Sequence, residues 1–172
     1  QLTGGLSPAA MSQAFSDWAI HLANAPGKQA DLVRKLLRKL LRLSIYAARA
    51  PFDPGTPPAI EPLPEDRRFT GPEWQQLPFS LYYQSFLMVQ QWWHNATTDI
   101  RGVDPRHAEV VHFAMRQILD AISPSNFLPT NPEVLRVTTE QSGQNLWRGW
   151  QNWFEDAERV LLGRPPVGAD AF

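Results

Sequence analysis

The sequence of 172 residues contains no cysteine. This absence excludes disulfide bonds, thiolate zinc sites and a cysteine nucleophile. There is also no G-x-S-x-G turn, no glycine-rich phosphate loop and no H-E-x-x-H pair. We therefore expect no catalytic residue and no cofactor-binding residue in this chain.

Long apolar runs are missing as well. No stretch approaches the roughly 18 apolar residues that a membrane-spanning helix needs. The chain does not open with a charged segment followed by an apolar one, so no secretory leader is predicted. Because the first residue is Gln1 and not Met, we expect a segment of a longer protein.

Histidine is scarce and scattered. His107 and His112 are five positions apart, about 140° around a helix, whereas two ligands on one helix need a spacing of four. His21 and His94 stand alone in the sequence. We therefore expect no metal site.

The composition suits a folded domain, and the charges are distributed unevenly along the chain. The chain is 43% hydrophobic and 19% charged, enough to build a core. Its net charge is −1, yet residues 28–49 carry seven cations and one anion, so this segment is +6 and the remainder is −7. Such a division favours two surfaces with different partners.

Apolar spacing predicts an all-α fold. Ser7-Pro8 is typical of a helix start, and a first helix should end near residues 24–27. A second helix should cover residues 28–48. Prolines then fill residues 50–72 and predict an extended, stiff linker. We expect this linker (50–72) to separate a two-helix amphipathic arm (1–49) from a body of three to four helices (73–172).

Proline, glycine and capping residues divide the body. One helix is predicted over 78–98 and another from the Asp104-Pro105 start to about Ser123. Their apolar stripes contain Tyr82, Phe86, Val89 and Trp93, then Val111, Met115, Ile118 and Ile122. Asn131-Pro132-Glu133 should begin a last helix, interrupted near Ser142-Gly143.

The second helix divides into two halves. Leucine and valine fill one side of the cylinder, and five cations fill the other: Arg34, Lys35, Arg38, Lys39 and Arg42. These cations are candidates for binding an anionic lipid or granule surface, or an acidic partner. In the alternative interpretation, the leucine face packs on this protein and the cations are merely solvated. We expect no nucleic-acid partner, because the chain as a whole is slightly acidic.

Seven tryptophans are many for this length. Trp147, Trp150 and Trp153 step by three positions and so spread around their helix. We expect most of the seven to lie in the core and the others to anchor an interface.

The loop from Ser123 to Glu133 reads SPSNFLPTNPE. Its prolines end one helix and its asparagine starts another, but Phe127 and Leu128 are large apolar groups for a loop. The run resembles the PSNF-x-x-TNPE segment of bacterial polyhydroxyalkanoate synthases. The same order of motifs continues the resemblance on both sides: Asp66-Arg67-Arg68-Phe69 with Trp74, Ser142-Gly143-Gln144-Asn145-Leu146 with Arg148-Gly149, Glu155-Asp156, and Ala171-Phe172.

This resemblance covers residues 66–172 and implies the non-catalytic N-terminal domain of an acyltransferase that polymerises hydroxyacyl-CoA into polyester. The parent enzyme would use a cysteine in a downstream α/β-hydrolase domain, and none of that site lies here. Family roles would be support of the catalytic domain or its homodimer, localisation to cytoplasmic polyester granules, and binding of a phasin-like granule protein. Phe127, Leu128, Trp150 and Trp153 are the expected contacts with the catalytic domain.

A protein of a different functional class is the alternative to a synthase domain. The second hypothesis is a stand-alone helical adaptor that binds an anionic membrane or granule surface through the basic helix, with no enzyme attached. Salt-sensitive vesicle binding would be common to both hypotheses, so the length of the gene distinguishes them.

Overall fold

The computed structural model describes residues 7–165 and residue 167. Within them the protein is all-α, as predicted, and no strand occurs. The helices are α1 (Pro8–Ala23), α2 (Pro26–Arg49), α3 (Phe79–Thr97), α4 (Pro105–Ala121), α5 (Pro132–Glu140) and α6 (Gln144–Leu161), with short 3₁₀ turns η1 (Pro72–Gln75), η2 (Pro124–Asn126) and η3 (Leu128–Thr130). The final pair of the family resemblance, Ala171-Phe172, lies outside the described residues.

Side-chain caps set the helix starts that the sequence predicts. The Ser7 hydroxyl accepts a hydrogen bond from the N–H of Ala10 at 3.1 Å, and Asp104 accepts from the N–H of Arg106 at 2.9 Å. Asn131 caps α5 in the same way. These bonds satisfy N–H groups that lack partners inside a helix. The predicted starts of α1, α4 and α5 are therefore confirmed.

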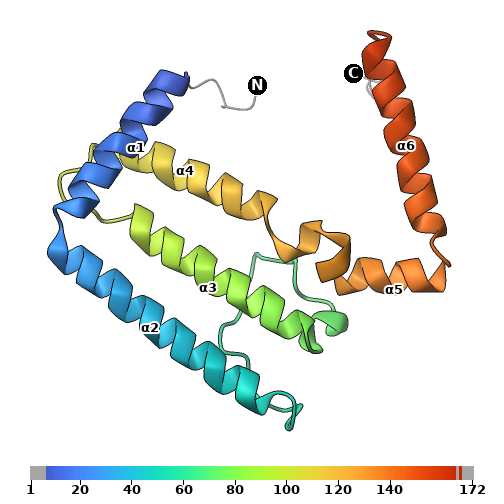
Figure 1. Ribbon diagram of the computed structural model, residues 1–172, viewed down its shortest axis with the longest axis horizontal. Coiled ribbons are helices and arrows are strands. Elements are labelled where there is room, and N and C mark those ends of the chain that lie inside the picture. Colours follow the sequence, from blue (N-terminus) through green and yellow to red (C-terminus); the bar gives the residue numbers. More distant parts are fainter. Residues whose placement is uncertain (1–6, 166, 168–172) are drawn as a thin grey trace.

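The predicted interruption of the last helix is also present. Ser142 (φ 50°) and Gly143 (φ 82°) adopt left-handed backbone conformations between α5 and α6. A left-handed residue ends a helix, and glycine adopts this conformation without a steric cost. As a result α6 leaves the body at a sharp angle and contacts α5 (Figure 1).

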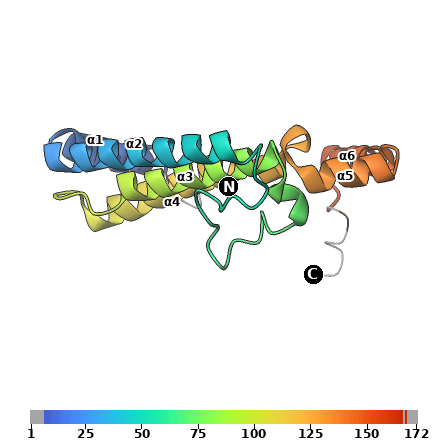
Figure 2. The ribbon, with the colours of Figure 1, turned by 90° about the horizontal axis from the view of Figure 1, so that it is seen from below.

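The helices form a thin, flat assembly, in which α1 and α2 lie to one side of α3 and α4 when it is seen edge-on (Figure 2). Helices α2, α3 and α4 lie side by side, and α1 packs against α2 and α4 (Figure 1). Seen edge-on, α5 and α6 continue the assembly, and the segment between α2 and α3 protrudes from one side (Figure 2). Such a thin assembly has two broad faces, so much apolar surface stays uncovered by the described residues.

The N-terminal helices lie on the body, although the sequence predicts an arm set apart by the linker. The indole N–H of Trp18 in α1 donates to the carbonyl oxygen of Ala96 at 2.9 Å. The indole N–H of Trp92 in α3 donates to the carbonyl oxygen of Leu32 in α2 at 3.0 Å. These cross-helix bonds join both arm helices to α3.

The proline-rich linker contributes to the core. Phe69 is fully buried and meets the ring of Trp74 edge-on at 5.0 Å, and both contact Tyr83 of α3. Ala59 is buried against Tyr46 of α2. The linker is therefore a packed cover over α3, which proline spacing alone did not predict.

The buried side of the body differs from the predicted stripes. Four stripe residues are about half exposed: Tyr82, Val89, Ile118 and Ile122. Phe86 and Val111 of the stripes are buried, and other buried positions lie outside them: Tyr83, Leu87 and Leu119. Helix α3 is covered by α2, by α4 and by the linker, so its buried surface is wider than one stripe and is rotated from it.

Gly71 allows the linker to approach α5. A Cβ at Gly71 would lie 2.6 Å from Oε1 of Glu133, and this oxygen accepts the indole N–H of Trp74 at 3.0 Å. We expect Gly71→Ala to displace Glu133 and lower the free energy of unfolding by about 1–2 kcal/mol, roughly one hydrogen bond with a charged acceptor. Urea unfolding followed by circular dichroism measures this loss.

Gly149→Ala provides the matched control. Gly149 lies inside α6, and a Cβ added there would meet no atom within 4 Å beyond its own stretch of helix. Alanine should therefore raise stability there by about 0.5–1 kcal/mol through helix propensity. Equal effects at the two glycines would contradict the tight contact at Gly71.

Candidate interaction surfaces

Helix α2 packs on α3 along the boundary between its two predicted halves. Lys35 donates to Oδ1 of Asn95 at 2.7 Å, and Lys39 donates to Oε1 of Gln91. Lys28 reaches the carbonyl oxygen of Thr98 at 2.8 Å. Two of the five predicted surface cations are thus directed toward α3, whereas Arg34, Arg38 and Arg42 are exposed.

The leucine face of α2 is left largely uncovered by the residues that the structure describes. Leu32 is buried, but five neighbours are 40–60% exposed: Val33, Leu36, Leu37, Leu40 and Leu41. An exposed apolar stripe beside an arginine stripe is the pattern of a helix that lies on an amphipathic surface. The structure therefore does not support the alternative in which the leucine face is part of the core.

Like charges are crowded on this helix. Burial lowers the pKa of Lys39, and the nearby charges of Arg42, Lys35 and Arg38 lower it further. The one anion, Asp31, is paired with Lys35 and Arg34, which lower its pKa to about 2. Contact with an anionic surface would relieve this repulsion.

Helix α6 exposes an aromatic face. The rings of Trp147 and Trp150 stack at 5.3 Å, and Trp150 stacks on Phe154 at 5.7 Å. These residues and Trp153 are 54–65% exposed, and α6 has no buried residue. Of the seven tryptophans, Trp74 is fully buried and three others are partly buried in the body: Trp18, Trp92 and Trp93. The remaining three are exposed on this face, as expected for interface anchors.

Phe127 and Leu128 form a second apolar patch, at the other end of α5 from α6. They are 48% and 38% exposed. Their loop is held by side-chain bonds, since Thr130 donates to the carbonyl oxygen of Pro124 and Asn131 to that of Ser125, each at 2.7 Å. The sequence predicts one face shared with Trp150 and Trp153, but the structure separates the two pairs along α5 (Figure 1).

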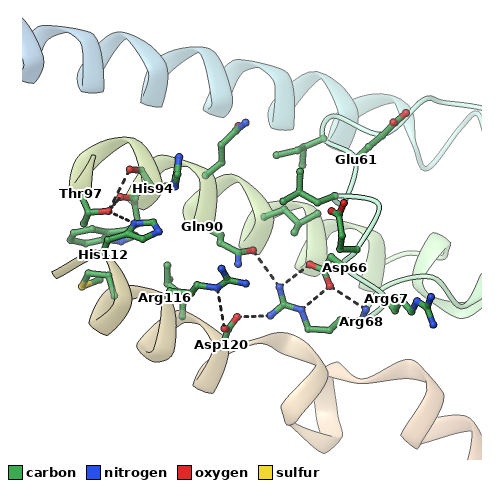
Figure 3. A pocket seen from close by; sticks show the side chains of 18 of the residues that line it. Glu61, Asp66, Arg67, Arg68, Gln90, His94, Thr97, His112, Arg116 and Asp120 are labelled. Carbon is green, nitrogen blue, oxygen red and sulfur yellow. Dashed lines mark hydrogen bonds and ion pairs between the residues drawn. The ribbon is translucent and has the colours of Figure 1, made fainter. Parts of the chain in front are cut away.

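A groove of about 1150 Å³ runs between α3, α4 and the linker. Its apolar wall includes Leu87, Trp93, Met115 and Leu119. Figure 3 shows the histidines at one end, Gln90 and Arg116 in the middle, and an ionic cluster around Arg68 at the other end. Sequence analysis missed this groove, because it exists only where the linker crosses two helices.

The ionic cluster closes one end of the groove. Arg68 donates to Oδ2 of Asp66 at 2.7 Å and to Oδ1 of Asp120 at 2.9 Å (Figure 3). Its guanidinium also lies 5.3 Å and 5.2 Å from the ring centres of Phe69 and Phe86. The hydrogen bond from Arg68 lowers the pKa of Asp66, so this pair remains ionised at neutral pH.

Two histidines mark the opposite end. The rings of His94 and His112 meet edge-on with centres 5.1 Å apart. Nδ1 of His112 lies 3.0 Å from the hydroxyl of Thr97, whose proton is directed to the carbonyl oxygen of Trp93 at 2.9 Å. Burial lowers the pKa of His112, and the direction of the Thr97 proton favours the neutral tautomer that carries its hydrogen on Nδ1. Among the described residues no third acidic, histidine or cysteine ligand joins this pair.

Asp17 joins α1 to the start of α4. Its carboxylate lies 2.8 Å from Nδ1 of His107 and accepts the N–H of Asp104 at 3.1 Å, and Nδ1 of His21 lies 2.9 Å from its other oxygen. The hydrogen bond from His107, with that from Asp104, lowers the pKa of Asp17. This contact therefore stabilises the fold most while Asp17 is ionised.

Acid should weaken the contact. Because the folded pKa of Asp17 is below its unfolded value near 3.9, its contribution is complete above about pH 5 and is lost as pH falls through the folded value. We expect Asp17→Asn to be less stable than the wild type at pH 7 and the difference to shrink toward pH 2, measured by urea unfolding at each pH.

Asp156→Asn is the control for this pH dependence. Asp156 is exposed on α6, and no ion pair of its carboxylate is present in the described part of the chain. A stability difference for Asp17→Asn that stays constant from pH 2 to pH 7 would contradict the role of the ionised carboxylate.

No described helix is both long and apolar enough to cross a membrane. The features above define a class: an all-α domain with an apolar and basic helix, an exposed aromatic helix and a groove. A family model described as poly-beta-hydroxybutyrate polymerase (PhaC) N-terminus matches residues 65–163, and one described as poly-beta-hydroxybutyrate polymerase N terminal matches residues 1–28. The chain belongs to this family of polymerase N-terminal domains.

Curated relatives agree with the family. A poly(3-hydroxyalkanoate) polymerase of Methylorubrum extorquens is 41% identical over 104 residues, which is 60% of this chain and 17% of the relative. A polymerase subunit of Cupriavidus necator is 32% identical over 146 residues, 84% of this chain and 24% of the relative. The chain thus spans less than a quarter of the length of these relatives. No solved structure matches it significantly.

Proposed function

We propose that this chain is the non-catalytic N-terminal domain of a polyhydroxyalkanoate synthase, an acyltransferase that polymerises hydroxyacyl-CoA. The family match over residues 65–163 carries the proposal. The domain supports the catalytic domain through the aromatic face of α6 and the patch of Phe127 and Leu128. Tryptophan-rich exposed faces favour such an interface, because aromatic side chains bury large areas at low entropic cost.

The assignment requires that the chain alone has no turnover. Purified protein incubated with 3-hydroxybutyryl-CoA should release no CoA above the buffer rate, measured with a thiol reagent. The absence of cysteine in the chain makes this readout free of background thiols. Release of CoA by the purified chain would contradict the proposal.

The second proposed role is attachment to the polyester granule in the cytoplasm through α2. Its exposed leucines would enter the apolar surface and its arginines would meet anionic groups there. Homodimerisation and a phasin-like granule protein are further proposed partners of the same domain. A free-standing adaptor would use this α2 surface too, and the gene sequence beyond the codon for Phe172 distinguishes it from a synthase.

Charge reversal tests the α2 surface. We expect the triple variant of Arg34, Arg38 and Arg42 to Glu to lose at least about tenfold in affinity for anionic lipid vesicles, at roughly 1 kcal/mol per cation near the surface. Co-sedimentation at two salt concentrations measures it.

The control reverses the same number of exposed cations elsewhere: Arg101, Arg106 and Arg164. It should retain most of the binding. If both triple variants lose affinity equally, then net charge and not the α2 surface determines binding.

A further inference from the structure

The residues that line the groove between α3, α4 and the linker have almost no net charge. Its lining contains three arginines and four carboxylates, so the sum is −1. Arg68 is neutralised by Asp66 and Asp120. A polyanion such as a CoA nucleotide would find no excess of positive charge here, and the groove therefore suits a neutral ligand.

Two glutamines that line the groove, Gln90 in its middle (Figure 3) and its neighbour Gln91, have spare donors. Gln90 uses Oε1 to accept from Arg68 at 3.4 Å, and Gln91 uses Oε1 to accept from Lys39. Arg68 and Lys39 can only donate hydrogen bonds. The atom of each glutamine amide that faces them is therefore the oxygen and not the nitrogen. The NH₂ groups of both glutamines have no protein acceptor in the described part of the chain.

Arg116 adds donors beside them. Its nearest carboxylate oxygen, on Asp120, is 3.9 Å away, and its side chain is 66% exposed. Other acceptors of the lining are located elsewhere: Glu61 and Glu65 lie at exposed positions of the linker, Oδ1 of Asn126 lies near Asp120, and Nε2 of His112 lies at the histidine end. The middle of the groove therefore combines an apolar wall of Leu87 and Met115 with unused hydrogen-bond donors.

We propose that this groove binds a stretch of neutral oligo(hydroxyalkanoate), an inference that rests on the proposed function. Such a chain has ester carbonyls, which only accept hydrogen bonds, and apolar pendant groups. Its carbonyls accept from the amide groups of Gln90 and Gln91 and from Arg116, and its pendant groups contact Leu87 and Met115. A peptide would in addition require acceptors for its own N–H groups along the groove.

An isosteric pair of substitutions tests this. Gln90→Glu with Gln91→Glu keeps the two oxygens that accept from Arg68 and Lys39 but removes both NH₂ groups. The control pair, Gln13→Glu with Gln117→Glu, adds the same charge at exposed positions of α1 and α4 outside the groove. The probe is a hexamer of 3-hydroxybutyrate capped at both ends, titrated into this 172-residue chain by calorimetry and by NMR of the Trp93 indole and glutamine amide signals.

We expect saturable binding of the hexamer, unchanged in the control pair and weakened at least about tenfold in the groove pair, as for the loss of two hydrogen bonds. No binding, or equal binding by both pairs, would overturn the proposal. Binding of a neutral apolar hexapeptide at these residues in place of the ester would assign the groove to a protein partner and overturn it as well.

This outcome is separable from that of the proposed function. The titration needs only this chain, whereas vesicle binding depends on α2 and the absence of turnover depends on no groove residue. Loss of hexamer binding with both of those results intact refutes the groove alone.

Discussion

Trp74→Ala should be the most destabilising single tryptophan substitution in this domain. The side chain is fully buried, packs edge-on against Phe69 and Tyr83, and donates its indole N–H to Glu133 of α5. Removing it leaves a large cavity and an unpaired carboxylate, so we expect the free energy of unfolding to fall by about 3–5 kcal/mol. Urea unfolding followed by far-ultraviolet circular dichroism measures the change.

The same substitution on α6 is the matched control. Trp153 is 65% exposed, and its loss should change stability by no more than about 0.5 kcal/mol in the isolated chain. A loss at Trp153 as large as that at Trp74 would mean that the aromatic face of α6 is buried within this chain in solution.

Introducing charge on that face should abolish function in a whole polymerase while leaving this domain folded. A chimera provides the test: the matching segment of the Methylorubrum extorquens polymerase is replaced by residues 65–163 of this chain. With Trp150→Glu and Trp153→Glu, we expect CoA release to fall more than about a hundredfold, because each hot-spot tryptophan contributes about 2 kcal/mol or more to an interface.

Conservative substitution is the control for the chimera. Trp150→Phe with Trp153→Phe keeps two apolar rings and should retain most of the activity. Full activity in the glutamate variant would show that the aromatic face does not contact the catalytic domain. Equal loss in both variants would assign a role to the indole groups themselves.

Local chemistry explains why the helices were predictable from sequence. Asp104 and Asn131 begin helices with bonds to nearby backbone N–H groups, so the signal and its effect lie within three residues. The break at Ser142-Gly143 is likewise local, since it depends on the backbone angles of two residues. Such features do not depend on the rest of the fold.

Contacts between segments that are distant in the sequence were harder to predict. The family motifs show this most clearly: Trp74 and Glu133 belong to separate motifs, yet they form one hydrogen bond across 59 positions. The sequence indicated Glu133 only as a charge at a helix start. Its second role, as the acceptor that anchors α5 to η1, required the fold.

The candidate surfaces, too, could be predicted from the sequence only in part. The two halves of α2 could be inferred from spacing, but which cations face α3 could not, because packing occurs at the boundary between the halves and takes Lys35 and Lys39. The groove donors on Gln90 and Gln91 had no sequence signal at all. Their availability depends on which partners hold the amide oxygens, and those partners come from the linker and α2.

Activity of the unmodified chimera tests the central claim most directly. CoA release from 3-hydroxybutyryl-CoA is measured for the chimera, for the Methylorubrum extorquens polymerase and for that polymerase without the segment. If this chain is the N-terminal domain of a polyester synthase, the chimera should reach within about tenfold of the intact relative and far exceed the truncated one. A chimera that folds but is no more active than the truncated enzyme would contradict the account.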